Sequence, residues 1–244
     1  MNVIVMMAGD SKGFHSDGEH YSKFLLEIDR KPMVEHVVDN IQSILTNNKV
    51  VFVINQEDNA RHFLGNVIKL LFPGAKIAIV GNNVAGAAIS SLLAIEHISK
   101  DEPLLIINGD QIIDIDFQSV IDSFGNSNLD AGVVVFNAVH PRWSYVKCDD
   151  SDYVVEAAEK KPISNWATAG FYYYKKTEEY IDHAKKMILK GAHVNNLYYI
   201  CPVFNEMILS QKKISTFKIK SEKYHSFMSP SKVEIYRQEL KNRT

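Results

Sequence analysis

The sequence predicts an α/β fold in which helices flank a mixed, mostly parallel sheet and the second half of the chain is rich in strands. In the first half, short continuous runs of Val, Ile and Leu alternate with segments of helical spacing. Strands that are apolar on both faces are typical of parallel sheets covered by helices. In the second half, β-prone segments are separated by turns. The chain has 244 residues, 46% of them apolar, which is enough for one large core.

The first half, up to about residue 125, is predicted to alternate strand and helix. The residues just after each strand matter most, because ligands of such sheets bind beyond the carboxyl ends of the strands. The predicted strands are 1–7, 49–54, 75–80 and 104–107. The predicted helices are 34–45, 57–71 and 86–98, and Pro73 with Gly74 ends the second of them.

The second half, from about residue 126 to 244, is predicted to combine strands with three helices. The strands are 130–136, 145–147, 153–158, 168–174 and 214–219. The helices are 177–189, 198–209 and 233–240, the last opened by Ser229-Pro230-Ser231. No repeat, low-complexity segment or linker divides the chain, so residues 1–244 are predicted to form one domain.

Composition and charge exclude several classes of partner. The 27 basic and 29 acidic residues give a formal charge of −2, which argues against a nucleic-acid or membrane-surface protein. No apolar run approaches the length that spans a bilayer, and no signal-like segment opens the chain. Cys148 and Cys201 match no metal-binding spacing and are expected to be free thiols in a reducing compartment, so the cytoplasm is the expected location. The sequence leaves the oligomeric state open, a homo-oligomer included.

The loop after the first strand has the features of a phosphate site. The apolar run ends at Ala8-Gly9, and a loop of small and polar residues continues as far as Tyr21. Glycine lets a backbone approach an anion closely, and Lys12 and Lys23 supply positive charge. No Gly-Lys-Ser/Thr closes the loop, so it is not a Walker loop. The alternative is an ordinary surface loop, because loops commonly contain such residues.

Two further segments place acidic residues after strands. Asp110 follows the predicted strand 104–107, where a carboxylate faces the crevice of the sheet and could hold Mg²⁺; the alternative is that it caps the next helix or turn. Glu159 stands beside Lys160 and Lys161, and this group could bind hydroxyls and phosphate. Its alternative is a solvated charge cluster.

Taken together, these segments resemble the nucleotidyltransferases that activate sugar phosphates, in particular the branch found in bacterial capsular-polysaccharide clusters. The resemblance runs along nearly the whole chain. Its motifs are Met7-Ala8-Gly9 to Phe14, Ser22-Lys23-Phe24-Leu25, Lys31 to Glu35, Gly86-Ala87-Ala88, Asn108-Gly109-Asp110-Gln111, Glu159-Lys160-Lys161-Pro162 and Ala169-Gly170-Phe171-Tyr172.

The resemblance implies a Rossmann-like fold of the nucleotide-diphospho-sugar transferase type and a nucleotidyl transfer. An NMP would pass from an NTP, CTP or UTP by family habit, to a sugar phosphate or similar phosphorylated compound, with release of pyrophosphate. It further implies Mg²⁺ as cofactor and a place in surface-glycan (capsule) biosynthesis.

The resemblance also assigns roles to residues. The catalytic ones would be Lys23, Lys12 and Asp110, and Asp110 would hold the metal. The nucleotide would be bound by Ala8, Gly9, Asp10, Ser11, Gly13, Gly86, Ala87 and Gly109. The acceptor would be bound by Gln111, Trp143, Glu159, Lys160, Gly170 and Tyr172.

Two departures from the family pattern keep other functions open. Gly13 stands where the family has an arginine, and no aspartate follows Gln211, although many relatives place a second metal ligand there. A catalytically inactive nucleotide- or sugar-nucleotide-binding protein is therefore one alternative. A glycosyltransferase of the same fold is another, based on the DxD form of Asp114-Ile115-Asp116.

Overall fold

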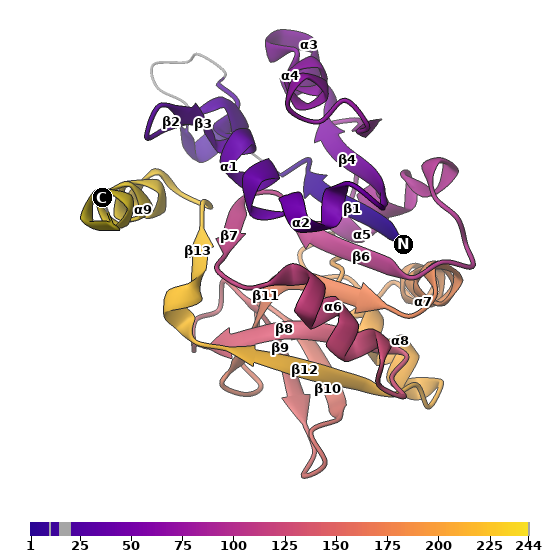
Figure 1. The fold of residues 1–244 in the computed structure, drawn as a ribbon. Coiled ribbons are helices and arrows are strands. Elements are labelled where there is room, and N and C mark those ends of the chain that lie inside the picture. Colours follow the sequence, from indigo (N-terminus) through magenta and orange to yellow (C-terminus); the bar gives the residue numbers. More distant parts are fainter. Residues whose placement is uncertain (10, 15–20, 244) are drawn as a thin grey trace.

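The protein was analysed as a computed structural model that describes residues 1–9, 11–14 and 21–243, without the side chains of Lys12 and Arg243. In this described part, nine strands form one mixed sheet, with the order β10-β9-β11-β6-β1-β4-β5 and with β8 and β12 branching from β11 (Figure 1). The strands are β1 (Asn2–Met7), β4 (Lys49–Asn55), β5 (Lys76–Val80), β6 (Leu104–Asn108), β8 (Ala131–Asn137), β9 (Ser144–Cys148), β10 (Val154–Glu159), β11 (Trp166–Tyr174) and β12 (Ile214–Ile219). The α/β fold with a mixed sheet predicted from sequence is confirmed.

The first half of the sheet is parallel, and its inner strands β1, β4 and β6 are buried on both faces. Strand β1 runs parallel to β4 and to β6, and β4 runs parallel to β5. Because side chains alternate along a strand, Val3, Val5 and Met7 enter one core and Ile4 and Met6 the other. The helices of this half are α1 (Met33–Asn40), α2 (Gln42–Leu45), α3 (Gln56–His62), α4 (Leu64–Leu71), α5 (Ala87–Leu92) and α6 (Phe117–Gly125).

The second half of the sheet is mainly antiparallel. Strand β11 runs antiparallel to β6 and β8, and the β9–β10 hairpin joins through Ala167 and Tyr145. The pairing of β11 with β8 shifts register between Thr168 and Tyr172, and Gly170 within this shift has a φ of 59°. The bulge thereby bends the strand at the point where it borders the crevice. Helices α7 (Thr177–Leu189) and α8 (Val203–Leu209) cover this half.

Several predicted helices are interrupted or shorter than expected. The predicted 34–45 helix divides into α1 and α2 at Ile41, and the predicted 57–71 helix divides into α3 and α4 at Phe63, whose φ of 53° no α-helix accommodates. The predicted 86–98 helix ends at Leu92 and continues as the 3₁₀ turn Ile95–His97. Apolar periodicity persists across these breaks, so it could not reveal them.

The predicted 198–209 helix starts only at Val203 because tertiary contacts claim its first residues. The backbone N–H of Tyr198 donates to the carbonyl of Ala85, and the Tyr198 carbonyl accepts from the N–H of Ala88. These two bonds hold Tyr198 in the segment that crosses from α7 to the first half of the molecule, and they exclude it from a helix.

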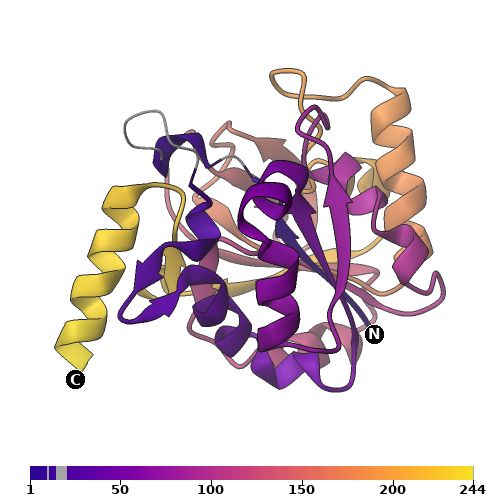
Figure 2. The ribbon, with the colours of Figure 1, turned by 90° about the horizontal axis from the view of Figure 1, so that it is seen from above.

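The C-terminal segment contains structure that the sequence did not predict. Strand β13 (Tyr224–Ser226) pairs with β7 (Gln111–Ile113). Near the start of the chain, a small hairpin formed by β2 (Glu27–Ile28) and β3 (Lys31–Pro32) was likewise not predicted. The terminal helix α9 extends over Pro230–Arg243, beyond the predicted 233–240. Figure 2 shows α9 (yellow) and α7 (orange) on opposite flanks of the molecule. No helix among the described residues combines the length and apolar character that a membrane crossing requires.

Candidate active site

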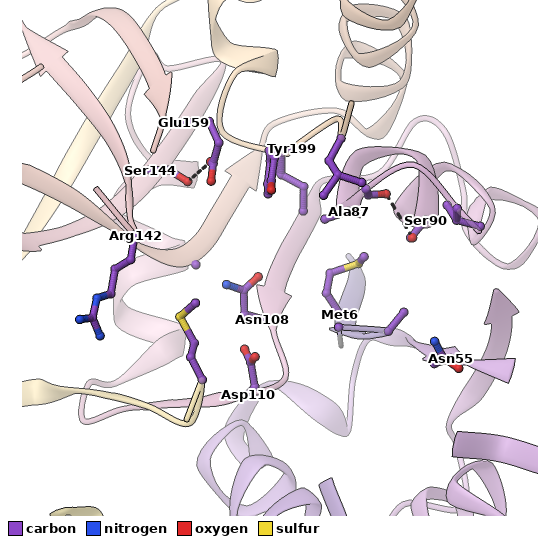
Figure 3. A pocket seen from close by; sticks show the side chains of 18 of the residues that line it. Met6, Asn55, Ala87, Ser90, Asn108, Asp110, Arg142, Ser144, Glu159 and Tyr199 are labelled. Atoms are coloured by element: carbon purple, nitrogen blue, oxygen red, sulfur yellow. Dashed lines mark hydrogen bonds between the residues drawn. The ribbon is translucent and has the colours of Figure 1, made fainter. Parts of the chain in front are cut away.

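A cavity of about 730 Å³ opens beyond the carboxyl ends of β1, β4 and β6, and the start of β9 and the end of β10 border its far side. Figure 3 shows the side chains of Asn108 and Asp110 on one side of it and those of Ser144 and Glu159 opposite. Eleven of the residues that the sequence assigned to a site line this one cavity: Ala8, Gly9, Ser11, Gly86, Ala87, Asp110, Trp143, Glu159, Lys160, Gly170 and Tyr172.

A close ion pair joins the two motifs that carry the predicted catalytic residues. The Nζ atom of Lys23 lies 2.6 Å from Oδ2 of Asp110. The lysine side chain is only 5% exposed, whereas the carboxylate is 22% exposed and lines the cavity. Lys23 belongs to the 3₁₀ turn Lys23–Leu25, and Asp110 follows β6, so the fold joins residues 87 positions apart. When an anion binds beside Asp110, the buried ammonium of Lys23 can donate charge-assisted hydrogen bonds to that anion in place of the carboxylate.

The first loop packs against this ion pair through small residues. A Cβ atom added at Gly9 would lie 3.3 Å from Nζ of Lys23, so the absence of a side chain leaves the ammonium room. Ser11 is buried, and its Oγ accepts from the backbone N–H of Lys23 at 3.3 Å. Gly13 is exposed within the 3₁₀ turn Lys12–Phe14. Asp10 lies outside the described residues, and only the backbone of Lys12 is described.

The wall formed by Gly86 and Ala87 is held by main-chain contacts. Gly86 has a φ of 103°, and a Cβ atom there would lie 2.4 Å from the carbonyl oxygen of Tyr198. Only glycine fits both the backbone conformation and the close approach. The backbone bonds of Tyr198 to Ala85 and Ala88 fix the same place, so this wall is preformed.

The opposite wall carries a buried carboxylate. Glu159 is 8% exposed and accepts a short hydrogen bond from the hydroxyl of Ser144, its neighbour across the β9–β10 hairpin (Figure 3). Burial raises the pKa of Glu159 above its ordinary value, while the Ser144 hydrogen bond and the charge of Lys160 oppose the rise. A carboxylate in this setting is suited to accept hydrogen bonds from hydroxyl groups of a ligand.

Other hydroxyl groups converge on the same wall. The hydroxyls of Thr168 and Tyr172 lie 2.9 Å apart and are buried, and burial holds the pKa of Tyr172 well above its ordinary value. The hydroxyl of Tyr199 accepts a hydrogen bond from Lys160 at 2.8 Å. Neutral hydroxyls around one carboxylate suit a polar, polyhydroxylated ligand.

Four predicted site residues are absent from the cavity lining of the described part: Gly13, Lys23, Gly109 and Gln111. Gln111 is buried and donates to the carbonyl of Ala169 at 2.7 Å, so it supports the bulge at Gly170 from behind. Gly109 lies against Met7, where a Cβ atom would approach the Met7 side chain to 2.2 Å. Lys23 reaches the site through Asp110.

Several lining residues had little or no signal in the sequence. Asn55 is the last residue of β4, and Asn82 and Asn83 follow β5; their place after the predicted strands was the available clue. Tyr224 and Met228 come from the C-terminal segment, and their contacts are too distant in sequence for any local pattern to indicate. The remaining polar lining includes Ser90, Arg142, Ser144, Thr168 and Tyr199.

Asp110 fits a magnesium ion held by a single protein carboxylate. In the described part, no three His, Cys, Asp or Glu side chains form a metal-binding group. Magnesium often keeps several waters and takes one or two carboxylates together with substrate phosphates. One oxygen of Asp110 contacts Lys23, and its carboxylate faces the cavity where phosphates would lie.

The DxD form of Asp114-Ile115-Asp116 is explained by the fold. The Asp116 carboxylate accepts from the backbone N–H groups of Gln118 and Ser119 and thereby caps α6. Asp114 lies 3.2 Å from Nε2 of His225. Neither aspartate lines the cavity, so the feature that suggested a glycosyltransferase does not indicate one.

The family model for nucleotidyl transferases matches residues 3–212. The chain belongs to the nucleotidyl transferase family. The match ends before β12, β13 and α9, yet Tyr224 and Met228 of that final part line the cavity of this nucleotidyl transferase.

Curated relatives show how much of the chain is shared. The chain is 26% identical to the bifunctional protein GlmU of Methanococcus aeolicus over 176 residues, which cover 70% of this chain and 39% of the relative. It is 24% identical to the UTP–glucose-1-phosphate uridylyltransferase AglF of Haloferax volcanii over 226 residues, which cover 90% of this chain and 88% of the relative. The chain thus spans about two fifths of GlmU and most of AglF.

Among solved structures, the nucleoside-diphosphate-sugar pyrophosphorylase of Vibrio cholerae superposes with a TM-score of 0.84 at 20% identity, covering 97% of this chain and 99% of that one. This likeness shows that the two chains share their fold.

Proposed function

We propose that the protein transfers a nucleotidyl group from an NTP to the phosphate of a polyhydroxylated acceptor, a sugar phosphate or a similar compound, and releases pyrophosphate. The observation that carries the proposal is the ion pair of Lys23 with Asp110 at 2.6 Å: Lys23 is buried behind Asp110, and Asp110 lines a cavity whose opposite wall presents Glu159. The relative named UTP–glucose-1-phosphate uridylyltransferase supports the same class of reaction.

In this reaction an oxygen of the acceptor phosphate forms a bond to the α-phosphorus of the NTP. The bond from the α-phosphorus to the oxygen bridging it to the β-phosphorus breaks, and that oxygen leaves as part of pyrophosphate. Little covalent chemistry falls to the protein, so positioning and neutralisation of charge carry the catalysis. Lys23 holds the two reacting phosphates together, and the backbone around Gly9 lies against the leaving pyrophosphate. Glu159 accepts hydrogen bonds from the acceptor hydroxyls.

Magnesium at Asp110 would supply charge neutralisation for the reacting phosphates. The ammonium of Lys23 pairs with the Asp110 carboxylate before the substrates bind, and it then pairs with a phosphate of the substrate. Lys12 takes the place of the arginine that relatives have at the position of Gly13, as a point charge and not as a fork of donors.

The nucleotide and the setting follow from the resemblance. CTP and UTP are the proposed donors, Gly86 and Ala87 lie against the base, and Trp143, Lys160, Gly170 and Tyr172 border the acceptor. The proposed role is the activation of a building block for a bacterial surface glycan, such as a capsule, in the cytoplasm.

The test is release of pyrophosphate from each of the four NTPs with Mg²⁺ and a panel of sugar phosphates, with the nucleotide-linked product identified by mass spectrometry. We expect one pyrimidine NTP and a small set of acceptors to turn over. Omission of the acceptor is the control, and it should abolish the release.

A catalytically inactive binding protein is the second candidate, favoured by Gly13 and by the lack of an aspartate after Gln211. It predicts that NTPs raise the melting temperature while no acceptor in a broad panel yields product. Product formation by the wild-type protein, lost in Asp110→Asn, would exclude it.

A further inference from the structure

Two cations, Arg142 and Lys160, lie beside Glu159 at the end of the cavity where the acceptor is proposed to bind, which we call the acceptor end. The β9–β10 hairpin brings them together. Glu159 pairs with Ser144 across the β9–β10 hairpin, and the backbone N–H of Lys160 donates to the carbonyl of Trp143 at 3.0 Å. Arg142 and Lys160 therefore flank the paired positions, and both line the cavity. Lys160 has a φ of 54°, which is uncommon for a residue other than glycine.

Neither cation has a carboxylate partner within ion-pair distance among the described residues. The Nε of Arg142 contacts Nδ1 of His140 at 3.1 Å, and Nζ of Lys160 donates to the hydroxyl of Tyr199 at 2.8 Å. Glu159, the neighbouring acid, is engaged by Ser144. This differs from Lys23, whose charge is matched by Asp110. A hydrogen bond from Ser144 does not cancel the charge of Glu159, so with Glu159 ionised this end carries two positive charges against one negative.

The same cations cover the aromatic rings of this end. Arg142 lies 5.8 Å from the centre of the Trp143 ring, and Lys160 lies 5.0 Å from that of Tyr199. A cation of the protein thus lies over each ring, so an ammonium group of the acceptor would find these faces taken and would be repelled by both charges. The arrangement thus selects against cationic acceptors and favours anionic ones.

The position of Arg142 separates it from the reacting phosphate. Asp110 follows β6, Arg142 precedes β9, and β11 lies between these two strands in the sheet. Two strand spacings correspond to about 10 Å. Figure 3 likewise shows Arg142 and Asp110 apart, with Asn108 beside Asp110. A phosphate held by Lys23 would not be the group that Arg142 binds.

We propose that the acceptor is an acidic polyhydroxylated phosphate, which carries a second anionic group at the end remote from its reacting phosphate. Arg142 binds this group, a carboxylate or a second phosphate, and Lys160 adds charge from the other side. The planar guanidinium matches either group with two parallel hydrogen bonds, and its stacking on Trp143 orients it in advance. The inference rests on the proposed function and names the substrate class of the same site.

The test compares three acceptors that differ only at the remote end: α-glucose 1-phosphate, α-glucuronic acid 1-phosphate and α-glucose 1,6-bisphosphate. With Mg²⁺ and the NTP that supports turnover, we expect kcat/KM for the two acidic acceptors to exceed that for glucose 1-phosphate by about tenfold or more. The better of the two acids identifies the group as carboxylate or phosphate.

Variants connect this preference to Arg142. In Arg142→Gln the ratio of kcat/KM for an acidic acceptor to kcat/KM for glucose 1-phosphate should fall toward one. Arg142→Lys keeps the charge but lacks the two parallel donors of a guanidinium, so it should restore this ratio only in part. Lys160→Gln should lower the ratio less than Arg142→Gln. Lys161→Gln is the matched control, because Lys161 is exposed and does not line the cavity; its ratio should equal that of the wild type.

Three results would overturn the inference. The wild type could use the three acceptors equally, Arg142→Gln could lower kcat/KM for all three by the same factor, or it could weaken NTP binding, which would assign Arg142 to the triphosphate. If no acceptor turns over, the proposed function fails separately, and calorimetric titration with the three compounds in the presence of NTP decides. The inference is supported if the wild type binds an acidic acceptor more tightly than glucose 1-phosphate and Arg142→Gln loses this difference. It is rejected if the wild type binds the three compounds equally or binds none of them.

Discussion

The two walls of the cavity are built differently. The wall of the first half consists mainly of backbone and small residues, represented by Gly9, Gly86 and Ala87. The wall of the second half consists of large polar side chains held by one another, represented by Glu159 with Ser144 and by Tyr172 with Thr168. A backbone wall can bind groups common to every substrate, such as phosphates, whereas a side-chain wall can distinguish one acceptor from another. Substitutions on the two walls should therefore act on different kinetic constants.

The largest effect is expected where the walls meet, at Asp110. Asp110→Asn keeps the shape and removes the charge, so turnover per folded molecule should fall by about 10³-fold. It also leaves the buried ammonium of Lys23 unpaired, which should cost roughly 2–3 kcal/mol of unfolding free energy, less than for a fully buried pair because the carboxylate is 22% exposed. Turnover and urea unfolding measure the two effects.

The double variant Lys23→Met, Asp110→Asn is the control for this prediction. It removes the unpaired charge, so stability should recover while activity stays lost. If Asp110→Asn unfolds earlier and yet keeps full activity per folded molecule, the ion pair is structural and the two walls do not meet in a catalytic centre.

The next effect concerns the backbone wall. Gly86→Ala places a Cβ atom 2.4 Å from the Tyr198 carbonyl at a φ of 103°, and such strain costs about 1–3 kcal/mol. We expect NTP affinity to fall by about 10- to 100-fold, whichever acceptor is present. Calorimetry with the NTP alone measures it, and Gly191→Ala, also at positive φ but with open space around it, shows the effect of backbone strain without the contact. An equal loss of NTP affinity in both variants would contradict a specific role of the Gly86 wall.

The difference between the walls also explains what the sequence could predict. Gly86 and Asp110 line the cavity, and they were expected near one edge of the sheet because each comes after a predicted strand and the carboxyl ends of parallel strands meet at one edge. Tyr224 reaches the site from 113 residues beyond its hydrogen-bond partner Gln111, and no local pattern reports such a contact. The backbone wall was therefore predictable from strand ends.

Helix boundaries show the same limit. Phe63 adopts a left-handed conformation inside an otherwise helical apolar pattern, and Tyr198 is kept out of a helix by its bonds to the loop of Gly86. Tertiary contacts decide both cases, and a periodic pattern records only which residues are apolar.

A smaller effect is expected on the side-chain wall. Glu159→Gln removes a charged hydrogen-bond acceptor worth about 1.5–3 kcal/mol, so the acceptor KM should rise by about one to two decades while NTP affinity stays the same. Steady-state kinetics with each substrate varied in turn separates the two constants. An increase in both KM values would show that the walls are not independent.

The pH dependence of the same residue has a definite sign. Burial raises the pKa of Glu159 above its ordinary value of 4.5, so as the pH falls from neutrality its carboxylate takes up a proton sooner than an exposed one. The acceptor KM of the wild type should then rise at mildly acidic pH, and that of Glu159→Gln should stay flat. Between 4.5 and the raised pKa the folded state binds more protons than the unfolded state, so this group's contribution to stability falls as the pH rises through that window. A wild-type acceptor KM that is independent of pH would argue against hydrogen bonding by the ionised carboxylate.

The smallest effect is expected in the first loop, where this chain departs from its family. Among the described residues, nothing lies within 4 Å of a Cβ atom added at Gly13, and Gly13 is not among the residues at positive φ, so the described surroundings accommodate an arginine. Gly13→Arg should change stability by no more than about 0.5 kcal/mol. If the protein handles triphosphate, the added fork should strengthen NTP binding by up to about tenfold, and Lys12→Ala should weaken it. Both are measured by titration with the NTP and Mg²⁺. Unchanged affinity in both variants would mean that the backbone wall no longer binds a triphosphate, and it would favour a binding protein whose remaining specificity lies in the side-chain wall.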